Sequence, residues 1–173
     1  MKIYNKNIKL NCFTHWNILI LLLCIYNNNF IHNYYINNNF IHNYIYNNYI
    51  NLYNITACWS WSIFITFHSG IIYDNNAFFK IRKKINCNFI EFHSGNFILH
   101  TLPCLYIYYY PPINIRYYDS YVALFIKGLW VYISTNKTMD LSGIYVAFSN
   151  KTVKQLYITS IISCLSVPFF YKI

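Results

Sequence analysis

Acidic side chains are almost missing from this chain. Its 173 residues include four, namely Asp74, Glu91, Asp119 and Asp140. Charged residues make up 10% of the chain, whereas a soluble domain usually has about 25%. Apolar residues make up 57%, and a soluble fold would have too few charged groups to cover a core of that size. We therefore predict a mainly α-helical, multi-pass membrane protein, located in a membrane, whose partner is the lipid bilayer.

The net charge of +9 raises the question of nucleic-acid binding, because Lys and Arg neutralise phosphates. Only two of the thirteen basic residues are Arg, and one tight cluster occurs, at residues 80–84. The positive excess therefore arises from the missing acids and not from a dedicated basic face. We predict no nucleic-acid partner, and we expect the cluster to lie next to a membrane and face anionic lipid.

Three regions differ in composition, residues 1–26, 27–56 and 57–173. In the first, three Lys precede a largely apolar run, Trp16–Tyr26, which is the pattern of a signal peptide or a membrane anchor. The run is shorter than the roughly 20 residues of a spanning helix, and Asn27 follows it in place of a small-residue cleavage site. An uncleaved anchor, a cleaved signal and a buried helix all remain open for this region.

Residues 27–56 form an Asn- and Tyr-rich tract with a ten-residue repeat. The octet NNNFIHNY occurs at 27–34 and again at 37–44, and the tract has no Lys, Arg, Asp or Glu. A ten-residue period is too short for solenoid or propeller units, which run from about 20 to 50 residues. The composition predicts disorder or β-aggregation. His32 and His42 are identical copies within the repeat, so we interpret them as products of its expansion and not as metal ligands.

Residues 57–173 are the predicted membrane domain. The long apolar stretches of this region are 57–73, 89–110, 121–133 and 156–171. None is an unbroken run of about 18 apolar residues, the length typical of a spanning helix. With the first apolar run included, the pattern predicts three to five spans.

The basic residues alternate between the two sides of a five-span topology. With the N-terminus inside, the cluster 80–84 and Lys151 with Lys154 also fall inside, whereas Arg116 falls outside. This is the positive-inside pattern of membrane proteins, with Lys172 as an exception. Because the chain has so few charges to distribute, a chance match would look the same.

The residue usage also carries information about the gene. Residues with A/T-rich codons (Phe, Tyr, Met, Ile, Asn and Lys) account for 100 of the 173 positions, whereas residues with G-initial codons (Ala, Gly, Val, Asp and Glu) account for 17. Four of these 17 precede residue 91, so the shortage is concentrated in the first half. An alternative interpretation is therefore that the chain is the product of a non-selected, A/T-rich reading frame without a function.

The weak candidates for a functional site lie in the apolar stretch 89–110. Glu91, His93 and His100 are ionisable groups in a predicted span, where such groups by default indicate function. They support a third interpretation, a membrane-embedded enzyme or transporter subunit that uses a Glu/His site. The competing interpretation, which we favour, is that Glu91 and His93 mark the interface where the span begins.

A metal site in the same stretch is not predicted. On a regular helix His93, His100 and Cys104 would share one face. Their spacing matches no standard zinc pattern, and Gly95 and Pro103 are expected to interrupt the helix. We predict no metal and no cofactor. Glycine-rich phosphate loops and nucleophile elbows are also missing, so the sequence indicates no enzymatic activity.

The six cysteines are scattered along the chain without a C-x-x-C motif. A chain this apolar offers them hydrophobic surroundings, in which Cys behaves as a small buried hydrophobe. We therefore expect free, buried thiols in preference to disulfides.

Overall fold

The computed structural model describes residues 13–33, 40–84, 86–134 and 149–171. In chain order the helices are α2 (Phe13–Asn33), α3 (Phe40–Tyr73), α4 (Asn75–Lys84), α5 (Phe89–Asn96), the π-helical turn η1 (Phe97–Thr101), α6 (Leu102–Tyr109), α7 (Tyr117–Ser134) and α8 (Asn150–Phe170). No strand occurs among the described residues, and the prediction of a mainly α-helical chain is confirmed for them.

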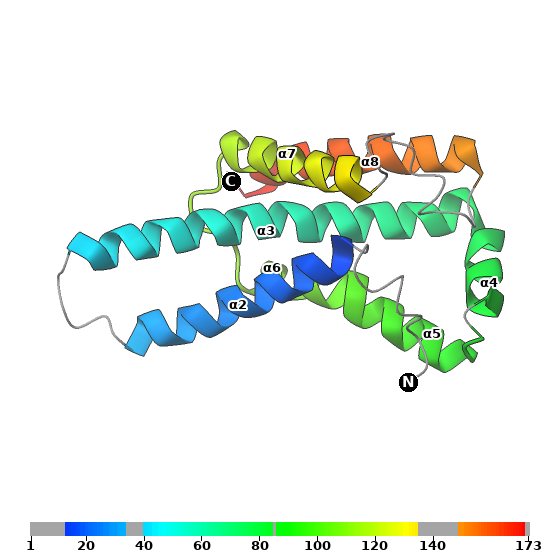
Figure 1. The fold of residues 1–173 in the computed structure, drawn as a ribbon, viewed down its shortest axis with the longest axis horizontal. Helices are drawn as coiled ribbons and strands as arrows, with labels where there is room; N and C mark the ends of the chain where they lie inside the picture. The colour runs from blue at the N-terminus through cyan, green and yellow to red at the C-terminus, as the bar shows by residue number, and fades with distance from the viewer. Residues whose placement is uncertain (1–12, 34–39, 85, 135–148, 172–173) are drawn as a thin grey trace.

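α3 is the central helix of the bundle (Figure 1). Its 34 residues span about 51 Å at 1.5 Å per residue. α7 and α8 lie along one side of α3, and α2 and the rod formed by α5, η1 and α6 lie along the other. The short helix α4 crosses the end of α3. Because α2, α6, α7 and α8 all contact α3, this helix organises the bundle.

The interior of the bundle contains an apolar cluster around Phe13, Trp59 and Ile63, together with many small and polar side chains. Among the largest fully buried side chains of the described residues, only Ile107 and Val167 are aliphatic. The others are Asn17, Asn54, Thr56, Ser60, Ser62, Asp119, Pro168, Cys24, Cys58 and Cys164. The three cysteines in this set are free thiols, as expected from the sequence. Small side chains let helix backbones approach closely, and their polar groups can bond across the interface.

Hydrogen bonds between buried groups join α3 to its neighbours. Asn17 Nδ2 of α2 donates to Ser60 Oγ of α3 over 3.1 Å. The indole N–H of Trp59 donates to the Ala123 carbonyl of α7 over 2.8 Å. Because a buried polar group is costly when it lacks a partner, these bonds fix the rotation of α2 and α7 against α3.

The α5–η1–α6 rod is continuous but has a defect near its middle. Asn88 Oδ1 accepts a hydrogen bond from the Glu91 N–H (2.8 Å), and Glu91 Oε2 accepts one from the Asn88 N–H (3.2 Å), which completes a capping box. The π-turn at 97–101 lies next to Pro103, which lacks the backbone N–H that a regular α-turn requires. The interruption expected from the sequence therefore takes the form of a π-turn, and the rod continues through it.

The Asn-rich tract is helical where the structure describes it. Residues 27–33 complete α2, and residues 40–56 form the first half of α3. The prediction of disorder is wrong for these two segments, while residues 34–39 of the tract lie outside the described residues.

Tertiary contacts explain why the composition of the tract misleads. Asn is a weak helix former, but the side chains near the middle of α3 bind the segment that precedes α7. Asn54 Nδ2 donates to the Ile113 carbonyl over 3.1 Å, and the Tyr53 hydroxyl donates to the Tyr110 carbonyl. These partners lie 57 to 59 residues further along the chain, so they cannot be predicted from the composition of the tract.

Two helical segments among the described residues are long and apolar enough to cross a membrane. They are Asn48–Tyr73 in α3 and Lys151–Phe170 in α8, each with a mean hydropathy of 1.3. Phe13–Tyr26 in α2 is a shorter apolar helix. The four later apolar stretches of the sequence lie in α3, the α5–η1–α6 rod, α7 and α8 in turn.

Candidate functional site

A lysine reaches into the interface of three helices. Lys127, in the middle of α7, donates hydrogen bonds from Nζ to Ser62 Oγ of α3 (3.2 Å) and to Ser160 Oγ of α8. The two serines are also linked to each other, because Ser62 Oγ donates to the Ser160 carbonyl over 2.8 Å and lies 2.9 Å from Ser160 Oγ. Both serines are buried, so the ammonium lies inside the bundle. These three residues form the lysine–serine cluster.

Lys127 has no acidic partner in the part of the chain that the structure describes. The ion pair between Arg116 and Asp119 is the one found there. The Phe13 ring lies 5.7 Å from Lys127 Nζ and provides a cation–π contact. Hydroxyl oxygens and an aromatic face bind an ammonium group but do not neutralise its charge. A buried charge without a counter-ion is costly. Ionisable groups in such surroundings are typical of functional sites.

In the sequence, Lys127 is a lone basic residue within the apolar stretch 121–133. A lone Lys within such a stretch was the signal available for the site. Its partners Ser62 and Ser160 lie 65 and 33 residues away, so no local pattern connects the three residues.

Glu91 and His93 lie on the surface at the start of α5. The Glu91 carboxylate takes part in the capping box of that helix. The His93 ring contacts the rings of Phe89 and Phe92, with centroids 4.1 Å and 5.5 Å away. Both residues therefore lie near the beginning of the rod, and their position at a membrane interface stays a prediction.

His100 lies further along the rod, in the π-turn. Its ring stacks on Phe67 of α3 at 4.0 Å, and its Nδ1 lies 3.1 Å from the Asn96 carbonyl oxygen. His93 is exposed whereas Cys104 is buried, because the π-turn adds a residue and rotates the side chains that follow. The common face expected for a regular helix is therefore not formed. Within the described ranges, no group of three or more His, Cys, Asp or Glu could hold a metal ion.

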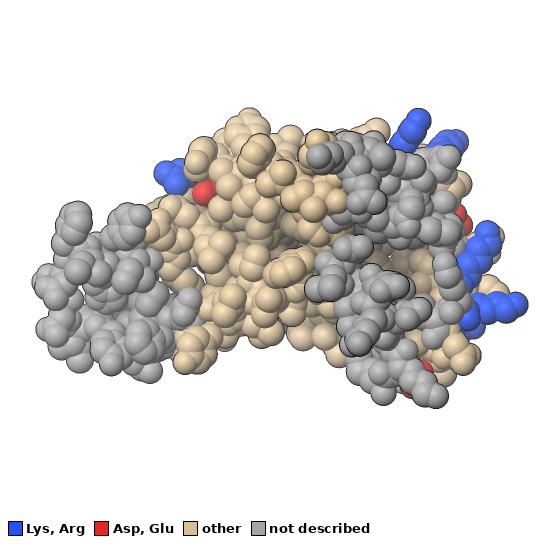
Figure 2. Space-filling model, in the orientation of Figure 1, with Lys and Arg blue, Asp and Glu red and all other residues tan. Residues whose placement is uncertain are grey.

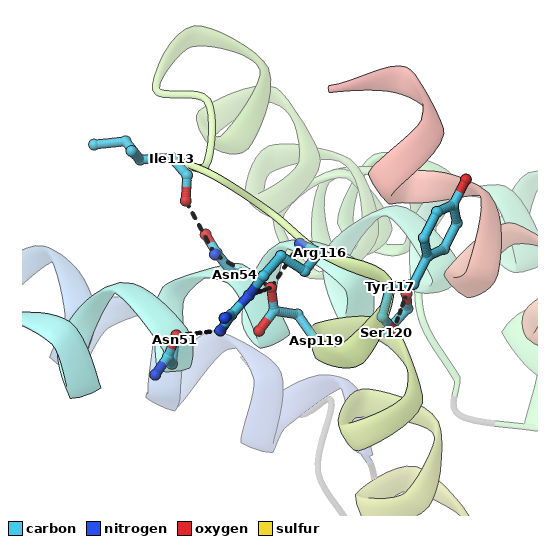
Figure 3. A network of polar contacts seen from close by, with 7 residues as sticks. All are labelled: Asn51, Asn54, Ile113, Arg116, Tyr117, Asp119 and Ser120. Atoms are coloured by element: carbon cyan, nitrogen blue, oxygen red, sulfur yellow. Dashed lines mark hydrogen bonds and ion pairs between the residues drawn. The ribbon is translucent and has the colours of Figure 1, made fainter. Parts of the chain in front are cut away.

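A second polar cluster fixes the start of α7 against α3 (Figure 3). Asp119 Oδ2 accepts a hydrogen bond from the Arg116 backbone N–H (2.8 Å) and a longer one from Asn54 Nδ2 (3.4 Å). Arg116 Nη2 in turn donates to Asn51 Oδ1 of α3 over 3.3 Å. Asp119 is 1% exposed, so its carboxylate is a buried anchor that caps α7 and joins it to α3.

Replacement of Asp119 by Ala is expected to lower the free energy of unfolding by about 2–3 kcal/mol. Asp119 is the third residue of α7 and accepts a hydrogen bond from the backbone N–H just before the helix, so the change removes one half of a capping interaction. It also leaves the Arg116 N–H and one N–H of the Asn54 amide short of an acceptor. Denaturant unfolding of the purified chain, followed by circular dichroism, measures the loss. Asp119→Asn keeps an acceptor oxygen and should lose less. Equal losses in the two variants would argue against the capping role.

Comparisons with protein-family models, with curated proteins and with solved structures find no match to this chain. The proposals below therefore rest on the geometry and chemistry of the chain itself.

Proposed function

We propose that this chain is a small integral membrane protein that crosses the bilayer as a bundle of helices around α3. The observation that supports the proposal best is the set of large apolar side chains that the outer helices expose, while small polar side chains are buried beside the apolar ones. On α8, Ile158 and Ile162 are more than half exposed, whereas Ser160, Ser163 and Cys164 are buried. A helix on the surface of a soluble protein has the reverse pattern, with its apolar stripe facing the core.

Other outer helices also expose large apolar side chains. The exposed apolar residues include Leu19, Leu22 and Leu23 on α2 and Phe125, Leu129 and Ile133 on α7. A spacing of three or four residues places them on one face of each helix. Contiguous apolar surface contacts a partner protein or lipid. We assign it to lipid because it occurs on helices at both sides of α3.

The charged side chains also follow the arrangement of a spanning bundle. On the face shown in Figure 2, Lys and Arg gather at the end where α4 crosses, and charged groups also mark the opposite end. The visible surface between the two ends has no Lys, Arg, Asp or Glu among the described residues. An uncharged belt of this kind matches the hydrocarbon layer, where a charged side chain costs several kcal/mol.

Alkaline carbonate extraction of cell membranes tests the proposal directly. We expect a tagged copy of the chain to remain in the membrane pellet together with an integral marker protein, because its apolar outer face holds it in the bilayer. A peripheral marker protein in the same sample should be released and serves as the control. Release of the chain while the integral marker stays in the pellet would refute the proposal.

The alternative of a membrane-embedded enzyme or transporter subunit acting through Glu91, His93 and His100 has less support. The Glu91 carboxylate caps its own helix, and His93 is exposed. For a chain that handles an ion or a proton, the lysine–serine cluster is the better candidate, because it joins three helices inside the bundle.

The alternative of a non-selected reading frame has a simple test. Trypsin cuts after Lys and Arg, so cuts after Lys127, Lys137 and Lys151 should release the peptides 128–137 and 138–151, both of detectable length. Detection of these peptides from the endogenous protein by mass spectrometry would exclude this alternative.

A further inference from the structure

α4 has the features of a helix that lies on a membrane surface. It crosses the end of α3 and runs transverse to the long helices (Figure 1). Its sequence, NNAFFKIRKK, places aromatic and aliphatic residues beside four cations within ten residues. A short amphipathic helix in this position is typical of the interface between lipid headgroups and acyl chains.

The inner face of α4 packs against the bundle through aromatic contacts. The Phe78 ring lies 5.2 Å from the Phe67 ring of α3, in an edge-to-face arrangement. It also lies 6.4 Å from the Phe92 ring of α5. These contacts hold α4 across the end of the bundle and leave its other side facing outward.

The outer side of α4 combines cations with an exposed ring. Phe79, Lys80 and Lys83 are all exposed, and Phe79 lies one turn before Lys83 on the same side. The Arg82 guanidinium lies 5.3 Å from the Phe79 ring and 5.9 Å from the Phe89 ring. In water this exposed ring gains only the weak cation–π contact with Arg82. At the headgroup boundary the ring can enter the apolar layer while the cations meet phosphates.

The same end of the bundle has an excess of positive charge. The basic residues on α4 and at the start of α8 are Lys80, Arg82, Lys83, Lys84, Lys151 and Lys154, and the acidic residues next to α4 are Asp74 and Glu91. Among the residues of the described helices at this end, six basic against two acidic residues leave an excess of four positive charges. At the opposite end, Arg116 pairs with Asp119.

We propose that α4 lies in the headgroup layer of an anionic phospholipid leaflet, with its cations on the lipid phosphates and Phe79 below them. The inference rests on the proposed membrane location and adds the lipid chemistry that this end of the bundle selects. We choose an anionic leaflet because of charge complementarity. A neutral leaflet could also take up the Phe79 ring, but it would leave the excess positive charge of this end without counter-charges. The anionic leaflet of a cell membrane is the cytoplasmic one, so the contact also orients the bundle.

Amine acylation of the full chain in lipid nanodiscs tests this contact. The discs contain phosphatidylcholine alone or phosphatidylcholine with added phosphatidylglycerol, and mass spectrometry gives the acylation rate at each lysine. We expect Lys80 and Lys83 to react at least about fivefold more slowly in the anionic discs, since each Lys near an anionic surface gains roughly that factor in affinity. High salt should remove the protection, because it screens exposed charges. Equal rates in the two kinds of disc would overturn the inference.

Matched variants separate the charge of α4 from its shape. Lys83→Asn removes one cation from an exposed position, and Lys83→Arg keeps the charge there. The protection of Lys80 in anionic discs should fall severalfold in Lys83→Asn and should stay unchanged in Lys83→Arg. The same protection in both variants would show that lipid charge does not act through α4.

Two further outcomes are informative. A single-stranded oligonucleotide that protects Lys80 and Lys83 in neutral discs as well as the anionic lipid does would assign the surface to nucleic acid and overturn the inference. Loss of the chain from both kinds of disc would mean that the membrane location itself fails. Stable retention of the chain in both kinds of disc with equal acylation rates would refute only the proposed contact of α4 with anionic lipid. The failure of that contact and the failure of the membrane location are therefore distinguishable.

Discussion

The double variant Ser62→Ala/Ser160→Ala is expected to lower the free energy of unfolding by about 3–5 kcal/mol, the largest loss we anticipate for a change of two atoms. The reason is the lysine–serine cluster, in which the Lys127 ammonium donates to both hydroxyls. Hydrogen bonds to charged groups are worth about 1.5–3 kcal/mol each, and a buried charge without partners costs more than the same site without a charge. Denaturant unfolding in detergent micelles, followed by circular dichroism, measures the loss.

Lys127→Met is the matched control for the double variant. Met has a similar length without the charge, and replacement of a buried charged group by an apolar one of similar volume is often neutral or stabilising. We expect Lys127→Met to be as stable as the parent chain. When Ser62→Ala and Ser160→Ala are added to Lys127→Met, they should lower the free energy of unfolding much less than they do in the parent chain. A double variant that is fully stable with Lys127 in place would show that the ammonium does not depend on the serines.

A second large effect is expected from a charge placed on the exposed apolar side of α8, which faces lipid in the proposed membrane bundle. Ile162 is 62% exposed and lies near the middle of that helix. In a soluble protein, Ile162→Arg would change stability little, because surface substitutions usually stay within about 0.5 kcal/mol. In a bilayer, an Arg at the helix centre costs about 2.5–3.5 kcal/mol on insertion scales. We therefore expect the fraction of chain that resists carbonate extraction to fall severalfold.

Ile72→Arg provides the comparison for this prediction. Ile72 is 81% exposed and lies at the end of α3, next to α4 and the basic residues. An Arg there can reach the headgroup layer, so the variant should insert as well as the parent chain. Insertion of Ile162→Arg at the parent level would contradict the membrane location of α8.

The helices of the second half could be predicted because apolar runs of their length have few other stable structures. The run at 121–133 lies in α7, and the run at 156–171 lies in α8 apart from its last residue. The extension of α3 back to Phe40 could not be predicted in the same way. The local Asn-rich composition pointed to disorder, whereas Tyr53 and Asn54 at the end of the tract bind a segment that follows much later in the chain.

The candidate site could be predicted only in part. Lys127 was visible as a charge within an apolar run, whereas Ser62 and Ser160 look like any other serines of the chain. Their role follows from the rotation of α3, α7 and α8 about their axes. These helices are apolar around most of their circumference, so no stripe in the sequence indicates which side faces inward. The π-turn at 97–101 likewise depends on local backbone geometry near Pro103.

The central position of α3 determines the order in which the bundle can assemble during synthesis. Ser62 of α3 finds its hydrogen-bond partner in Ser160, 98 residues later. At about 5–20 residues per second, a ribosome needs roughly 5–20 s to cover that distance. During this interval, α3 has left the ribosome while the side of it that packs on α8 is still without its partner. For the proposed membrane protein, the polar side chains on that side would therefore stay in the translocation channel, or beside a chaperone, until α8 has been made.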